Sequence, residues 1–150
     1  MTAIAFYHLE ASTLETVLAK LLEKALAGGL RVVVKAGSEE RVAALDTALW
    51  TYEQGSFLAH GSAQDGNGLD QPVWLTHGDD NPNSATVLFL TDGSQSAEIT
   101  GYDRCLELFD GRDVAALEKA RSHWQAYKDG GHELTYWRQG ARGGWQQQDP

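Results

Sequence analysis

Three residues in the last third of the chain, Arg121, Trp124 and Lys128, have the types and spacing of a binding surface rather than of a reaction centre. Residues three, four and seven positions apart lie on one face of a helix, so two cations would flank one large aromatic ring. Cations pair with carboxylates, and an indole packs against apolar groups. The arrangement therefore predicts a site for a short acidic peptide with an apolar end.

The helix that carries these residues is expected over 112–129 and has a separate apolar side. That side is marked by Ala116, Ala120 and Tyr127. Trp124 lies at its border, and Leu117 shares the same edge of the helix. Arg121 and Lys128 are rotated away from the core. The pattern also permits another interpretation, in which the indole belongs to the core and the cations form a solvated face.

A second aromatic surface is expected where the preceding helix ends. Trp50 closes an apolar stripe with helical spacing, and Phe57 follows in an irregular segment. Large apolar side chains at such a place either cover the core or form an exposed anchor for another protein. The sequence pattern leaves both interpretations open.

Asp92 carries the main alternative function, that of a small nucleotide-binding α/β enzyme. It follows a predicted buried strand, where an acid can hold magnesium. Phosphate binding also needs a loop of backbone amides with a lysine. The motif Gly-x-x-x-x-Gly-Lys-Ser/Thr is absent from the corresponding loop at 35–38. Asp92 is therefore interpreted as a turn residue.

The other reactive side chains form no catalytic or metal-binding pattern. The five histidines are spread along the chain, and His77 near Asp79 is expected in a solvated loop. Cys105 is the only cysteine, and no neighbour in sequence would activate it. Such a cysteine is usually a small buried apolar residue. We expect no enzymatic activity, no metal and no cofactor.

Composition restricts the class of partner. The formal net charge is −9 over 150 residues, which repels nucleic-acid phosphates and anionic lipids. We therefore expect protein partners and no direct nucleic-acid or membrane partner. The first nine residues lack the features of a signal peptide, and no apolar run is long enough to span a bilayer. The expected class is a soluble, cytoplasmic protein.

The hydrophobic pattern alternates strands and helices, which is typical of an α/β fold with a crossover sheet. Strands are expected over 3–9, 30–34, 72–76 and 86–91, and helices after caps at Ser12 or Thr13 and at Ser38. The stretch 102–109 suits a helix or a strand, and 132–139 suits a final edge strand.

One domain is expected from the length of the chain. Its α/β part covers residues 1–140, with a polar, glycine-rich and mobile loop over 61–70. Residues 141–150, rich in glycine and glutamine, are expected to be a disordered tail.

Several short motifs together resemble the chi subunit of bacterial DNA polymerase III holoenzyme over residues 3–139. They are Phe6-Tyr7-His8-Leu9, Leu45-Asp46-x-x-Leu49-Trp50, Ser56-Phe57-x-x-His60, Pro72-Val73-Trp74-Leu75, Ala120-Arg121-x-x-Trp124-x-x-Tyr127-Lys128 and Leu134-Thr135-Tyr136. Their common order and spacing carry the resemblance. It implies a three-layer α/β/α domain with a mostly parallel sheet and no enzymatic activity of its own.

The resemblance also implies a partner for the helix face. Chi-like proteins connect the clamp-loader assembly to single-stranded DNA-binding protein by gripping its acidic C-terminal tail, which ends in an apolar residue. Arg121, Trp124 and Lys128 correspond to this tail-binding surface. Leu117 and Gln125 belong to the same surface and occupy positions where the family often has lysine, so this patch is less cationic.

The resemblance gives the second aromatic surface a partner as well. Trp50 and Phe57 match the positions at which chi-like proteins dock the psi subunit or, alternatively, an accessory helicase. The partner expected at this surface is therefore psi, another clamp-loader protein or a helicase.

Overall fold

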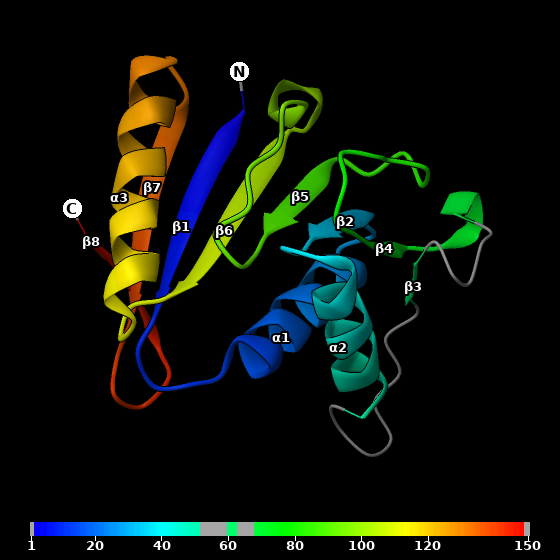
Figure 1. Cartoon of the computed structure of the whole chain (residues 1–150), viewed down its shortest axis with the longest axis horizontal. Helices are drawn as coiled ribbons and strands as arrows, with labels where there is room; N and C mark the ends of the chain where they lie inside the picture. Colours follow the sequence, from blue (N-terminus) through cyan, green and yellow to red (C-terminus); the bar gives the residue numbers. More distant parts are fainter. Residues whose placement is uncertain (1, 52–59, 63–67, 149–150) are drawn as a thin grey trace.

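Eight strands of one sheet and three α-helices contain most of the residues that the computed structural model describes, which are 2–51, 60–62 and 68–148 (Figure 1). The strands are β1 (Ala3–Leu9), β2 (Val32–Lys35), β3 (His60–Ser62), β4 (Val73–Thr76), β5 (Val87–Leu90), β6 (Arg104–Asp110), β7 (Glu133–Gln139) and β8 (Trp145–Gln148). The helices are α1 (Leu14–Ala27), α2 (Glu39–Trp50) and α3 (Val114–Asp129), with short 3₁₀ turns at Gly68–Asp70 and Ile99–Gly101.

The sheet has the strand order β3-β4-β2-β5-β6-β1-β7-β8. Its neighbouring strands pair in parallel except for β7 and β8, which are antiparallel. The predicted α/β class with a mostly parallel sheet is therefore confirmed.

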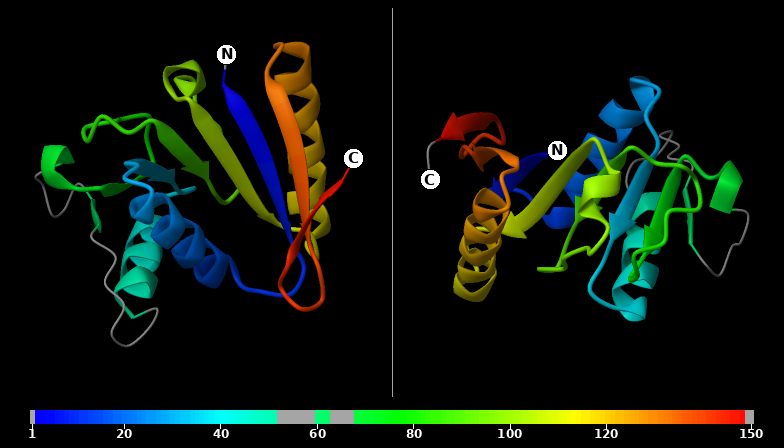
Figure 2. Two further views of the ribbon diagram at one scale, coloured as in Figure 1. Left: turned by 180° about the vertical axis from the view of Figure 1, so that it is seen from behind. Right: turned by 90° about the horizontal axis from the view of Figure 1, so that it is seen from above.

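Two cores lie on opposite faces of the sheet, because successive side chains of a strand point in opposite directions. Val32 and Val34 of β2 pack in the core formed with α1 and α2, whereas Val33 packs in the core that contains Ala120 and Tyr127 of α3. Figures 1 and 2 show α1 and α2 together at the β2 half of the sheet and α3 alongside β1 and β7. This is the expected three-layer arrangement.

Each helix begins at a side chain that accepts hydrogen bonds from its first turn. Thr13 accepts from the amide of Thr16 at the start of α1, and Ser38 accepts from that of Arg41 at the start of α2. The sequence predicted Ser38 as a cap and left Ser12 and Thr13 as alternatives, of which Thr13 is the cap. At α3 the cap is Asp113, which places the helix start two residues after the predicted one.

The ambiguous stretch 102–109 contains a strand. β6 lies between β5 and β1 and pairs in parallel with both. Cys105 and Leu108 are buried on opposite faces of it, one in each core, and the cysteine was expected to be buried. Neighbouring strands on both sides, which the sequence pattern does not reveal, decide between strand and helix here.

The expectation of a disordered tail over 141–150 is wrong for Trp145–Gln148, which form β8. The amide of Gly140 donates to the Gly144 carbonyl at 2.7 Å, and Gly143 takes φ 88°, which only glycine adopts readily. The resulting hairpin pairs β8 with β7, so β7 is not the edge strand that was expected. Trp145 stabilises the hairpin by packing edge-on against Tyr7, with ring centroids 4.9 Å apart.

The expected mobile loop over 61–70 is also wrong in part. Gly61 and Ser62 belong to β3, which pairs in parallel with β4, and Gly68–Asp70 form a 3₁₀ turn. Residues 63–67 lie outside the described part of the chain.

A buried ion pair connects α3 to the sheet. His123 Nδ1 lies 2.9 Å from the Glu107 carboxylate of β6, and both residues are buried. Burial raises the pKa of Glu107, while the hydrogen bond and charge of His123 oppose this increase. His123 thus gives a hydrogen-bond partner to a carboxyl group that would be costly to bury beneath α3 without one.

Replacement of His123 by leucine should destabilise the fold more at neutral than at acidic pH. Because the pKa of Glu107 is raised, its contribution to stability is present at low pH and is lost as pH rises through the folded-state value. Without His123 this pKa rises further. We expect His123→Leu to lose about 3 kcal/mol of unfolding free energy at about pH 7.5 and clearly less at about pH 5 in urea titrations. The double variant with Glu107→Leu should recover much of the lost unfolding free energy. An equal loss at both pH values in His123→Leu would contradict the role of His123 as the partner of Glu107.

Candidate peptide-binding surface

The predicted site residues of α3 share one side of the helix, from which Trp124 contacts Tyr136 of β7. Arg121, Gln125 and Lys128 are exposed, whereas Leu117 and Trp124 are half-buried. The helix thus presents two exposed cations, with an indole between them that is accessible in part. This is the arrangement expected from their spacing.

Trp124 is held in place by two aromatic rings of the sheet. Its ring centroid lies 5.2 Å from that of Phe6 on β1 and 5.8 Å from that of Tyr136 on β7, both in edge-to-face geometry. Leu117 packs with it against the same core. One side of the indole is therefore fixed by aromatic packing, while the rest remains available to a ligand. The indole thus belongs to the core in part and is accessible at the surface in part, and its role in binding stays a prediction.

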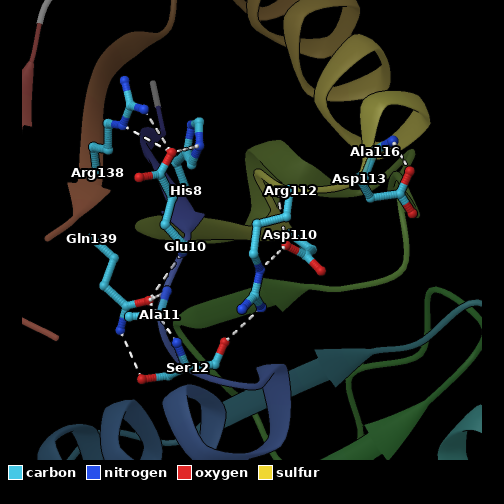
Figure 3. Close-up of polar contacts among 10 residues, drawn as sticks. All are labelled: His8, Glu10, Ala11, Ser12, Asp110, Arg112, Asp113, Ala116, Arg138 and Gln139. Carbon is cyan, nitrogen blue, oxygen red and sulfur yellow. Dashed lines mark hydrogen bonds and ion pairs between the residues drawn. The ribbon is translucent and has the colours of Figure 1, made fainter. Parts of the chain in front are cut away.

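Tyr136 begins a chain of hydrogen bonds that runs along the ends of β1 and β7. Its hydroxyl lies 2.5 Å from His8 Nδ1, and His8 Nε2 lies 3.0 Å from Glu10 Oε1. The same oxygen accepts from Arg138 Nη2 at 2.6 Å and Arg138 Nε at 3.1 Å (Figure 3). An aromatic ring in contact with Trp124 is thus connected to an exposed arginine.

The protonation states in this chain follow from its partners. Burial lowers the pKa of His8, and the charges of Arg138 and Arg121 lower it further against the opposing effect of Glu10. The pKa of Glu10 is also lowered, first by its hydrogen bond from Arg138. A carboxylate can only accept, so neutral His8 donates from Nε2 to Glu10 and accepts the Tyr136 hydroxyl proton at Nδ1. This orientation fixes the Tyr136 ring beside Trp124.

Gln139 attaches the loop after β1 to the end of β7. Its buried side-chain oxygen accepts from the backbone amides of Glu10, Ala11 and Ser12 at 2.8–3.1 Å, and its Nε2 donates to Ser12 Oγ at 2.9 Å (Figure 3). Three successive amides would otherwise lack a partner at this turn. A glutamine at the end of a predicted strand gives no sequence signal of this role.

Asp92 has the structural role that was inferred for it. It lies in a turn with φ 58°, and its carboxylate accepts from the Gly37 amide at 3.0 Å and from Arg41 Nε at 3.2 Å. The carboxylate thus ties the loop after β2 to α2.

Trp50 is exposed at the end of α2, with 54% of its surface accessible. Its ring lies 4.5 Å, centroid to centroid, from that of His60, and His60 Nε2 is 3.0 Å from Asp46 Oδ1. Trp50 is thus exposed at the surface, and its role as an anchor for another protein stays a prediction. Phe57, its predicted companion, lies outside the described residues.

Two further findings concern the described ranges as a whole. Within them, no three side chains among His, Cys, Asp and Glu are grouped in a way that would hold a metal ion. The helices in those ranges also lack the combination of length and apolar character needed to traverse a bilayer.

Sequence comparisons assign the chain to a protein family. A family model described as "DNA polymerase III chi subunit, HolC" matches residues 1–135. The chain belongs to this family. It is therefore an accessory subunit of the replication machinery, and partners of it are expected among the proteins of the DNA polymerase III holoenzyme.

Two curated chi proteins are similar to the chain. "Probable DNA polymerase III subunit chi" from Rickettsia prowazekii (strain Madrid E) is 27% identical over 109 residues, which cover 73% of this chain and 66% of that protein. "DNA polymerase III subunit chi" from Pseudomonas aeruginosa (strain PAO1) is 26% identical over 137 residues, or 89% of this chain and 94% of that protein. The match to the chi family model ends at residue 135, before Tyr136, Arg138 and β8.

Gly111 should be required for the position of His8. Its amide donates to the Leu9 carbonyl at 2.8 Å, and a Cβ atom at Gly111 would overlap the imidazole ring. We expect Gly111→Ala to lower the unfolding free energy by about 1–3 kcal/mol, because the ring must move and its hydrogen bonds to Tyr136 and Glu10 are disturbed. Gly101→Ala is the matched control, since a Cβ there meets no atom within 4 Å. Equal stability of the two variants in urea titrations would show that the His8 ring is not confined in this way.

Proposed function

We propose that the chain links the clamp-loader assembly of DNA polymerase III to single-stranded DNA-binding protein by gripping its acidic C-terminal tail. The observation that supports this most is the half-buried indole of Trp124 between the exposed Arg121 and Lys128, on a chain of net charge −9. Membership of the chi family supplies the replication context, in the cytoplasm, where such an assembly would act.

The two kinds of side chain at this surface have different tasks in the proposed complex. Tail carboxylates pair with Arg121 and Lys128, and the apolar end of the tail packs against the accessible part of Trp124 and against Leu117. Exposed ion pairs contribute roughly 0–1 kcal/mol each, so the contact with the indole provides much of the affinity. Arginine is the better carboxylate ligand of the two, because its planar fork donates two parallel hydrogen bonds.

The proposed contact is small, and its affinity is correspondingly modest. We expect micromolar binding, or about −8 kcal/mol. Gln125, where the family often has lysine, adds no charge, and its amide instead donates to Asp129 Oδ1 at 2.9 Å. A weak contact suits a connection that must exchange at a moving replication fork.

The exposed Trp50 is the proposed contact for a second partner. With 54% of its surface accessible on α2, it lies on a different helix from the tail-binding surface. We propose that it docks psi, another clamp-loader protein or a helicase, together with Phe57. Two separate surfaces would allow the chain to bridge two proteins without enzymatic activity of its own.

The tail-binding proposal predicts how a labelled acidic peptide with an apolar C-terminus responds to substitutions. Arg121→Ala should weaken binding about two- to five-fold, because one exposed ion pair is lost. Trp124→Ala should weaken it about ten-fold or more, because the apolar contact is removed. Fluorescence anisotropy measures both, and added salt should reduce the affinity of the wild type.

Two control variants separate this effect from general ones. Lys20→Ala removes an exposed cation from α1, and Trp50→Ala removes an exposed indole from α2; neither should change peptide affinity. Melting curves establish that Trp124→Ala remains folded, and Arg121→Ala tests the site without touching the core. Unchanged affinity in both site variants would remove this surface from consideration.

A further inference from the structure

Arg138 of β7 lies on the same face of the sheet as the tail-binding surface. Side chains two residues apart along a strand share a face, so Arg138 follows Tyr136, whose ring contacts Trp124. The register places Arg138 opposite His8. After burial, which is the largest effect, the positive charges of both Arg138 and Arg121 lower the pKa of His8. Arg138 is joined to His8 through Glu10, and Arg121 of α3 contributes to the electrostatic field at the same ring.

The direction of α3 sets the order of Lys128, Arg121 and Arg138 along this side of the molecule. The helix connects the parallel strands β6 and β7, so it runs opposite to them, and its first half lies near their carboxyl ends. Lys128 is thus at one end, Arg121 is near the middle of the helix, and Arg138 lies at the carboxyl end of β7. The carboxylates of an extended acidic peptide can meet these cations one after another.

Arg138 has donors left for such a carboxylate. Its Nε and Nη2 both donate to Glu10 Oε1, which uses two of the five N–H groups of a guanidinium. The other three have no partner among the described residues, and 47% of the side chain is accessible. A second carboxylate can therefore bind the guanidinium without displacing Glu10.

Glu10 reduces the attraction of Arg138 for an anion. Its Oε1 accepts from Arg138 and from His8, so it holds the guanidinium in position, but its negative charge cancels much of the positive field nearby. Glutamine at this position would keep the accepting oxygen and remove the charge. Glu10→Gln therefore tests the charge of Glu10 separately from its role in positioning Arg138.

We propose that Arg138 is a second carboxylate-binding arginine of the surface, and that Glu10 both positions it and limits its affinity for an acidic peptide. The proposal rests on the proposed function, because it assumes the acidic tail as ligand. It extends the surface beyond α3 to the last part of β7, which lies after the residues matched by the chi family model.

The test measures binding of a synthetic peptide with a run of aspartates and an apolar C-terminal residue to four forms of the full chain. These are the wild type, Arg138→Gln, Glu10→Gln and the double variant. Arg138→Gln should weaken binding about three- to five-fold, and Glu10→Gln should strengthen it about two- to five-fold. The gain from Glu10→Gln should vanish in the double variant, because it acts through Arg138. Both effects should shrink at high salt.

Arg104→Gln is the matched control, because it also removes one exposed arginine. Arg104 pairs with Ala3, and both lie on the face of the sheet opposite to the tail-binding surface. The same peptide with asparagines in place of aspartates should not distinguish Arg138→Gln from the wild type. If Arg121→Ala weakens binding while Arg138→Gln or Glu10→Gln leaves it unchanged, this inference is wrong and the tail-binding surface on α3 stands. If the wild type does not bind the acidic peptide, the proposed function fails and the inference with it.

Discussion

The edge-to-face packing of Trp124 on Phe6 and Tyr136 is the interaction on which the proposed surface depends. It fixes the rotation of α3 about its own axis, since Tyr127 and His123 then face the sheet while Arg121 and Lys128 face solvent. If the indole were fully buried, the cations would flank no apolar contact. If it were free, it would lose conformational entropy when a ligand binds. Partial burial gives a rigid aromatic wall that is still accessible.

The chain is acidic as a whole, so an anionic ligand can be attracted only where positive charge is exposed and nearby negative charge is neutralised. Glu107, the carboxylate beneath α3, is buried and paired with His123. Glu10, which lies near the surface, is bound by Arg138 and His8. Glu107 and Glu10 are thus engaged by basic partners, while Arg121 and Lys128 remain exposed. A chain of net charge −9 can in this way attract an anionic segment at one place.

The sequence predicted those features that depend on local patterns. Ser38, and Thr13 as one of two candidates with Ser12, were recognised as helix caps because a short polar side chain precedes an apolar periodic stretch. The exposure of Arg121 and Lys128 and the border position of Trp124 followed from helical spacing. These inferences need only neighbours within one or two turns.

Features that depend on contacts between distant segments were missed. β8 was taken for a disordered tail because glutamines give no strand signal, and its pairing with β7 and the contact of Trp145 with Tyr7 stabilise it instead. The hydrogen bonds from Tyr136 through His8 to Arg138 join residues about 130 positions apart in the chain, with a sequence separation of 128 between His8 and Tyr136. No spacing rule finds such a group, so Arg138 was not among the predicted site residues.

The most direct measurement is an NMR titration of the ¹⁵N-labelled chain with the acidic tail peptide, following the indole N–H signals of its five tryptophans. We expect the signal of Trp124 to shift in a saturable and salt-sensitive way, while that of Trp50 stays in place. A shift at Trp50 with none at Trp124 would contradict this expectation, because the peptide would then bind at the end of α2 and not beside α3.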